Sequence, residues 1–145
     1  MPLRLVFDTN IYVMASGMPG GYIDYWLDLA LPPDNKFQLY TSSAILNEVQ
    51  TKLEQKMGLD RSQAVAYIDH LKQIAVEVSP TRKLDVVKTD PDDNMILECA
   101  IQAQADIIVT ADRDLLRLKQ FDGIQIHHPS NLKYIFSYLA GDELR

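Results

Sequence analysis

The stretch that decides the fold is residues 90–112, DPDDNMILECAIQAQADIIVTAD. Its opening predicts the start of a helix, because an aspartate, a proline and two further acids suit a first helical turn. We expect this helix to run to about Gln104. The short apolar run from Ile107 to Thr110 then predicts a buried strand, and Asp112 stands just past its end. A helix that leads directly into a buried strand is typical of α/β proteins.

Segments of the same two kinds flank this stretch along the chain. Short apolar runs predict strands at 3–7, 37–40, 107–110 and 124–127, with a weaker candidate at 75–78. Helical spacing of apolar residues predicts helices at 11–16, 22–31, from a Ser/Thr cap at 41–43 to Gly58, from a capping pair at 60–63 to about 75, at 90–104 and at 129–139. This alternation predicts a three-layer α/β/α fold with a central parallel sheet.

The composition is that of an ordinary globular domain. Hydrophobic residues make up 47% of the 145 residues and charged residues 23%, which excludes a disordered, collagen-like or coiled-coil chain. We expect one domain over residues 1–145, with a mobile tail after Gly141. The formal net charge of −6 excludes nucleic-acid binding through a broad basic face. Any phosphate chemistry therefore needs a local arrangement, such as metal ions.

The cysteine content and the apolar runs bear on the compartment. Cys99 is the one cysteine, so no disulfide forms within the chain, and a reducing compartment is the simplest expectation. The first apolar run is too short for a signal peptide, and no stretch approaches the roughly 18 apolar residues of a membrane span. We expect a cytoplasmic protein without a membrane segment, in which Cys99 is a packed thiol.

Carboxylates from four separate segments are expected at one edge of the sheet. Asp8 and Asp112 each follow a strand, Asp93 begins a helix, and Glu48 lies within the apolar arc of the helix after the second strand. Ligands of parallel sheets bind at the carboxyl ends of the strands. Converging carboxylates repel one another, and a divalent cation resolves this repulsion. Oxygen ligands without histidine or cysteine favour Mg²⁺ or Mn²⁺, which suits phosphodiester hydrolysis.

Each acid also has a purely structural interpretation. An aspartate after a strand is often a helix cap, and Asp93 suits the positive end of a helix dipole. Glu48 can pair with Lys52 one turn later, and Asp112 and Asp114 can be turn residues. The set is more specific than its members, because four segments deliver carboxylates to the same edge.

Three motifs in this order resemble those of the PIN domain family: VFDTN at 6–10, DPDDN at 90–94 followed by LECA at 97–100, and ADIIVTADRDLL at 105–116. The resemblance spans nearly the whole chain. It implies a metal-dependent nuclease. Many members are small stand-alone toxins that cleave RNA and are silenced by an antitoxin, the VapC-like proteins.

The resemblance also assigns site residues. It implies that the catalytic and metal-binding acids are Asp8, Glu48, Asp93 and Asp112. Asp114 is a candidate fifth ligand, and Asn10 and Thr110 match the polar residues that accompany the acids. The basic residues just beyond Asp112 are candidates for contacts with substrate phosphates, namely Arg113 and Arg117. Which acid of the crowded run at 90–93 faces the site stays open.

The leading hypothesis is a Mg²⁺- or Mn²⁺-dependent endoribonuclease that is the toxin of a toxin–antitoxin pair, with RNA as substrate and an antitoxin as partner. The alternatives are a non-catalytic PIN-like module that binds RNA or protein, and a phosphatase with Asp8 as nucleophile. Such phosphatases need a second aspartate where this chain has Asn10. We also expect a homodimer, because one early helix carries surplus apolar surface at Tyr22, Tyr25, Trp26, Leu27 and Leu31.

Overall fold

The computed structural model describes residues 3–17, 21–88 and 90–135. Within these residues a six-stranded sheet has the order β3-β2-β1-β4-β6-β5. Its strands are β1 (Leu3–Phe7), β2 (Phe37–Ser42), β3 (Ala75–Val78), β4 (Ile107–Val109), β5 (Gln120–Phe121) and β6 (Ile124–His127). Neighbouring strands run parallel, except that β5 and β6 are antiparallel. The predicted central parallel sheet is confirmed.

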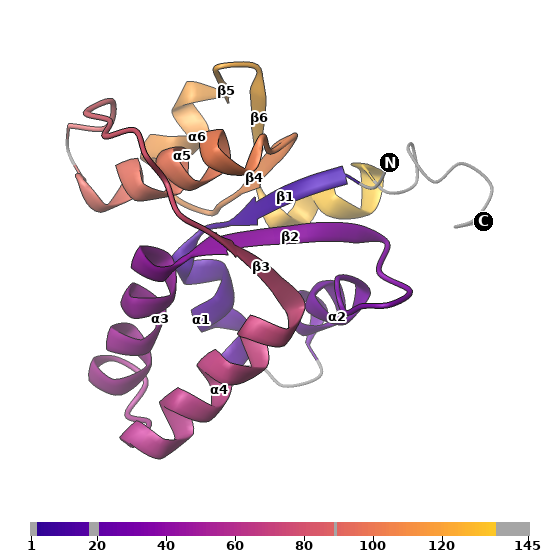
Figure 1. Ribbon diagram of the computed structural model, residues 1–145, viewed down its shortest axis with the longest axis vertical. Coiled ribbons are helices and arrows are strands. Elements are labelled where there is room, and N and C mark those ends of the chain that lie inside the picture. Colours follow the sequence, from indigo (N-terminus) through magenta and orange to yellow (C-terminus); the bar gives the residue numbers. More distant parts are fainter. Residues whose placement is uncertain (1–2, 18–20, 89, 136–145) are drawn as a thin grey trace.

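Helices flank the sheet on both sides. They are α1 (Thr9–Gly17), α2 (Tyr22–Leu29), α3 (Ser43–Gln55), α4 (Arg61–Ile74), α5 (Asp92–Ala103) and α6 (Arg113–Leu118), followed by a 3-10 turn, η1 (Pro129–Asn131). In Figure 1, α1 to α4 lie below β1, β2 and β3, whereas α5 and α6 lie above these three strands and beside β4 and β6. The three-layer α/β/α prediction is therefore confirmed.

Burial and capping explain why these segments form these elements. Leu5, Val6 and Phe7 are completely buried, as expected for a central strand that is covered on both faces. The Ser42 hydroxyl accepts the N–H of Ile45 at 3.3 Å and so caps α3. A capping box formed with Gln63 starts α4, as the sequence predicts.

Several boundaries differ from the predicted ones. The first helix begins at Thr9 instead of Ile11, because the Asp8 carbonyl already accepts the N–H of Ile11. The helix predicted to have Asp90 as its cap and Pro91 as its first residue begins one residue later, at Asp92, and the Asp90 side chain accepts the N–H of Asp92. It ends at Ala103 rather than at Gln104.

Elsewhere the predicted lengths were wrong by a few residues. The helix predicted over 22–31 ends at Leu29, and the strand predicted over 37–40 continues to Ser42. The last predicted helix begins as the 3-10 turn η1, and its later residues, 136–139, lie outside the described residues. The predicted mobile tail after Gly141 also lies outside them.

The sequence reading missed the antiparallel strand β5. It pairs with β6 through a tight turn in which Asp122 and Gly123 both have positive φ, 53° and 81°. Asp-Gly is a strong signal for such a two-residue hairpin. The strand escaped notice because it is only two residues long.

The surplus apolar surface of α2 is smaller than the sequence suggests. Trp26 and Leu27 are buried in the core. Of the residues predicted to form the surplus apolar surface, those with described side chains that remain exposed are Tyr25 and Leu31. Cys99 is buried, which confirms the packed thiol. Within the described ranges, no helix has both the length and the apolar character that crossing a membrane requires.

Candidate metal centre

The candidate site lies where the order of the strands in the sheet reverses direction. β1 is flanked by β2 on one side and by β4 on the other, and the later strands extend the sheet outward from each of these. This is the switch point of an open α/β sheet, where the carboxyl ends of the strands leave a crevice for ligands. Asp8 directly follows β1, and Asp112 follows β4 after two residues. The predicted placement of these two acids at the same edge is therefore correct.

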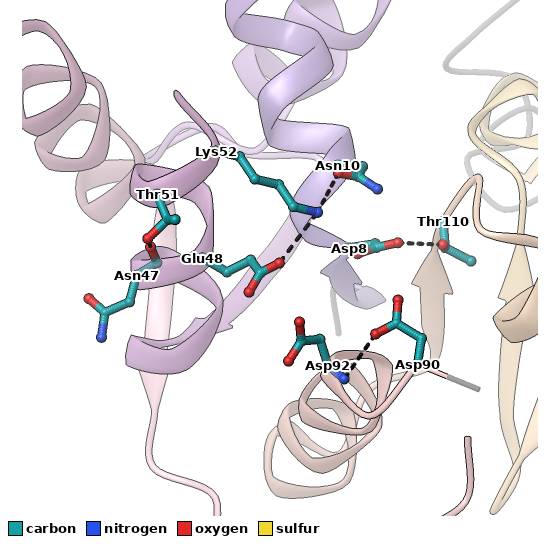
Figure 2. Close-up of polar contacts among 9 residues, drawn as sticks. All are labelled: Asp8, Asn10, Asn47, Glu48, Thr51, Lys52, Asp90, Asp92 and Thr110. Carbon is teal, nitrogen blue, oxygen red and sulfur yellow. Dashed lines mark hydrogen bonds and ion pairs between the residues drawn. The ribbon is translucent and has the colours of Figure 1, made fainter. Parts of the chain in front are cut away.

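Asp8 is buried and held in one orientation (Figure 2). Its Oδ2 accepts a 2.7 Å hydrogen bond from the Thr110 hydroxyl. Burial raises the pKa of Asp8 above its ordinary value, the hydrogen bond from Thr110 opposes this rise, and the charge of Asp112 adds to it. The carboxylate of Asp8 is thus costly to ionise unless a cation lies nearby.

Asp112 is fixed by its role as a helix cap. Its Oδ1 accepts the N–H groups of Asp114 at 2.8 Å and of Leu115 at 3.2 Å, which start α6. Its own N–H donates to the Thr110 hydroxyl at 2.9 Å. The structural interpretation of Asp112 as a cap is therefore correct. It is compatible with a site role, because the cap fixes where the carboxylate lies.

Among the described acids, Asp93 has the most strongly raised pKa. It lies in the first turn of α5 with only 6% of its surface exposed, and its Oδ2 has no hydrogen-bond partner among the described residues. Burial raises the pKa of Asp93 to about 8, and the neighbouring charges of Asp112, Asp90 and Asp8 contribute to this rise. A buried carboxylate oxygen without a donor is rare and calls for an explanation, of which a cation is one.

Three of the acids form a compact cluster. One carboxylate oxygen from each of Asp90, Asp93 and Asp112 lies within 4.8 Å of the others. Asp90 is therefore the acid of the 90–93 run that joins Asp93, whereas Asp92 lines the same pocket without belonging to the cluster. Asp8 lines this pocket as well.

The pocket fits an ion rather than an organic ligand. It has room of about 30 Å³, which is space for about two water-sized groups. Its donors are hard oxygen atoms, and the unpartnered Oδ2 of Asp93 lies among them. This donor set matches the preferences of Mg²⁺ and Mn²⁺.

Glu48 lies on the other side of this pocket and outside the three-acid cluster. It forms an ion pair with Lys52, with 3.4 Å between Oε1 and Nζ. Lys52 also donates a 2.9 Å hydrogen bond to Oδ1 of Asn10 (Figure 2). Sequence reasoning considered Lys52 only as a surface partner of Glu48, and it missed that this lysine lines the pocket.

The remaining predicted residues lie beside the pocket. Asp114 pairs with Arg117, with 3.2 Å between Oδ1 and Nη1. Arg113 is exposed. It lines a groove that meets the acidic pocket at Asn10 and Asp112, and the groove's apolar walls are Val13, Met14 and Ala111.

Comparison with known proteins agrees with this geometry. The sequence pattern of the PIN domain matches residues 4–114, which is more than half of the chain. The chain therefore belongs to the PIN domain family. A comparison with curated protein sequences found no match.

Two solved structures share the fold. One is the crystal structure of VapBC2 from Rickettsia felis bound to a DNA fragment from their promoter. It has 18% identity and a TM-score of 0.61, over 87% of this chain and 98% of that chain. The other is VapBC-1 from nontypeable Haemophilus influenzae, with 15% identity and a TM-score of 0.62, over 88% of this chain and 99% of that chain.

Proposed function

We propose that this chain is a cytoplasmic endoribonuclease that hydrolyses RNA phosphodiester bonds with Mg²⁺ or Mn²⁺, and that it is the toxin of a toxin–antitoxin pair. One observation carries the proposal. The buried Oδ2 of Asp93 lacks a partner among the described residues and lies in a cluster with oxygens of Asp90 and Asp112. Within a PIN domain, this arrangement supports a divalent cation site.

In this proposal Asp90, Asp93 and Asp112 hold the cation, and Asp8 completes the acidic wall. A bound divalent ion supplies positive charge to the substrate phosphate and lowers the pKa of an attacking water. Thr110 fixes the Asp8 carboxylate, and the cap on α6 fixes that of Asp112. Glu48 and Asp114 as further ligands stay predictions.

Local charge also supports RNA as the substrate. The chain has a formal net charge of −6, so contact with a polyanion depends on the bound cation and a few placed basic groups. Arg113 lies in the groove beside the acids and is a candidate for a contact with a flanking phosphate. Arg117 is the weaker candidate, because Asp114 already pairs with it.

The proposed partner is an antitoxin protein. The similar solved structures are VapBC assemblies, which supports a bound partner for this chain as well. A homodimer also stays a prediction. Of the predicted apolar surface, the exposed side chains among the described residues are Tyr25 of α2 and Leu31 just after it. Light scattering over a wide concentration range tests the dimer.

The two alternative functions have weaker support. An aspartate-nucleophile phosphatase needs an acid at position 10, and the Asn10 found there binds Lys52 instead. A non-catalytic binding module has no need of a buried carboxylate oxygen without a donor, and keeping one costs free energy.

The test is incubation of the purified protein with varied RNAs in Mg²⁺, in Mn²⁺ and in EDTA, analysed on a gel. We expect cleavage with either metal and none in EDTA. Equal cleavage in EDTA contradicts the metal dependence. Turnover of small phosphomonoesters without RNA cleavage favours the phosphatase, and no turnover of either substrate favours the binding module.

A further inference from the structure

One ammonium group among the described residues, that of Lys52, faces the acidic pocket. Lys52 extends from α3 so that its Nζ lies between Oδ1 of Asn10, at 2.9 Å, and Oε1 of Glu48, at 3.4 Å (Figure 2). Asn10 belongs to α1 and Glu48 to α3, so two separate helices fix the position of one charge. An exposed ion pair between residues four apart on one helix forms without a contact to a second helix.

Burial also separates Lys52 from an ordinary surface lysine. Only 20% of its side chain is exposed. The protein therefore covers most of the long apolar stem of Lys52, while the ammonium at its end reaches the pocket. A long side chain held in one place also gives up rotamer freedom. The Lys52 side chain is therefore ordered at the pocket at a cost in rotamer entropy.

The ammonium retains capacity for one further contact. Lys52 has three N–H donors, and Asn10 and Glu48 account for two of them. The third has no partner within the described part of the chain.

The charge balance of the pocket indicates what the third donor is for. Lys52 is the one lysine or arginine among the described residues that line it, and the other charged residues there are all acids. These acids repel a phosphate group until a cation covers them. A fixed ammonium beside the cluster attracts a phosphate oxygen and leaves the carboxylates free to hold the metal.

We propose that Lys52 binds a non-bridging phosphate oxygen of the substrate, and that Glu48 and Asn10 are positioning residues that hold its ammonium toward the acid cluster. This inference rests on the proposed nuclease function of the pocket. It gives Glu48 a role through Lys52 in place of the predicted role as a metal ligand.

A different role for Lys52 makes a separable prediction. If the ammonium only offsets repulsion among the carboxylates of the metal-free protein, removing it lowers stability in EDTA and strengthens metal binding. In that case kcat/KM for RNA cleavage does not change. If the ammonium binds phosphate, removing it lowers kcat/KM for RNA cleavage and does not weaken metal binding.

The experiment compares wild type with Lys52→Met, Lys52→Arg and the matched control Lys56→Met, which removes an exposed ammonium one turn further along the chain. The readouts are kcat and KM on one RNA that the wild type cleaves, and the rise in Tm on adding Mg²⁺. We expect Lys52→Met to lower kcat/KM by on the order of 10-fold or more, Lys52→Arg to recover part of this, and Lys56→Met to match wild type. The Tm rise of Lys52→Met should equal or exceed that of wild type.

Glu48→Gln tests the positioning role, because it retains an oxygen that can accept from Lys52. We expect it to keep the Mg²⁺-dependent Tm rise and, in the Lys52→Met background, to add no further loss of kcat/KM. A lost Tm rise in Glu48→Gln instead makes Glu48 a metal ligand and overturns its positioning role.

The outcomes distinguish a failure of the Lys52 proposal from a failure of the proposed nuclease function. A wild type that cleaves no RNA overturns the proposed function and the inference together. A wild type that cleaves RNA while Lys52→Met has a kcat/KM within about twofold of it overturns the inference alone. If Lys52→Met does not fold in a melt in EDTA, Lys52→Gln replaces it with the same criteria.

Discussion

Thr110 Oγ1 donates a 2.7 Å hydrogen bond to Oδ2 of Asp8 across the β1–β4 pair, although the two residues are 102 positions apart in the sequence. The same hydroxyl accepts the N–H of Asp112 at 2.9 Å. One small side chain therefore contacts both acids just beyond two neighbouring strands, through the carboxylate of Asp8 and the backbone N–H of Asp112. It also favours the ionised form of Asp8, because the bond is made to the carboxylate.

Replacing this hydroxyl tests its role directly. Thr110→Val removes the donor to Asp8 and the acceptor for Asp112 while keeping the shape of the side chain. We expect a loss of roughly 1–3 kcal/mol in the free energy of unfolding, a higher pKa for Asp8 and weaker Mg²⁺ binding. Thr110→Ser should restore most of each property. Equal Mg²⁺ binding by the Val and Ser variants, measured by the metal-dependent Tm rise, contradicts this assignment.

The raised pKa of Asp93 predicts a pH-dependent stability for the metal-free protein. Its pKa is about 8 in the fold and about 3.9 in an unfolded chain. Between these values the folded state holds a proton that the unfolded state has lost, so stability falls as pH rises from about 4 to about 8.

Asp93→Asn removes this penalty. In EDTA at pH 8 we expect it to unfold with a free energy higher than wild type by at least on the order of 1 kcal/mol, and with a flatter pH dependence. The exposed Asp69→Asn on α4 is the matched control and should follow wild type. If Asp93 acts only as a favourable charge at the start of a helix, Asp93→Asn unfolds more easily than wild type, which is the opposite sign.

Metal binding should itself depend on pH. A cation at the cluster needs Asp93 ionised, so binding releases a proton whenever the pH is below about 8. We expect the affinity for Mn²⁺ to rise steadily from pH 6 to pH 8, with proton release visible as a buffer-dependent heat in titration calorimetry. An affinity that does not change over this range means that Asp93 is not a ligand.

Asn94 ties the segment before α5 to the helix that carries the acids. Its Oδ1 accepts the N–H groups of Val86 and Val87, both at 2.9 Å, and its Nδ2 donates to the Val87 carbonyl at 3.0 Å. Asn94→Ala leaves these backbone groups without partners, at a cost of roughly 1–3 kcal/mol for each group that stays buried.

We expect Asn94→Ala to lower the free energy of unfolding by at least about 2 kcal/mol and to weaken Mg²⁺ binding as a secondary effect on Asp90 and Asp93. The exposed Asn47→Ala on α3 is the control and should change stability by less than about 0.5 kcal/mol. Urea unfolding of the two variants decides this. A stable Asn94→Ala variant with weak metal binding instead places Asn94 in the site itself.

The sequence was sufficient to predict the layered fold and the edge of the sheet at which the acids meet. Both follow from local patterns, since a fully apolar run such as Leu5 to Phe7 indicates a buried strand and the residue after it lies at the carboxyl end. The strand β5 was missed because two residues carry no periodicity, although Asp122-Gly123 signalled the turn.

The membership of the cluster was harder to predict than its location. Asp90, Asp92 and Asp93 differ by only a few positions, and the bond from Asp92 N–H to the Asp90 carboxylate decides where the helix begins. The place of Lys52 was beyond sequence reasoning, because its contact with Asn10 joins residues 42 positions apart through the packing of α1 on α3.

The most direct test of the central claim is the rate of RNA cleavage as a function of Mn²⁺ concentration for wild type, Asp93→Asn and Asp69→Asn. We predict saturable, EDTA-reversible cleavage by wild type and Asp69→Asn, and a rate at least roughly 100-fold lower for Asp93→Asn at every concentration. Cleavage by Asp93→Asn at the wild-type rate, with the same dependence on Mn²⁺, would contradict the assignment of this cluster as the metal centre.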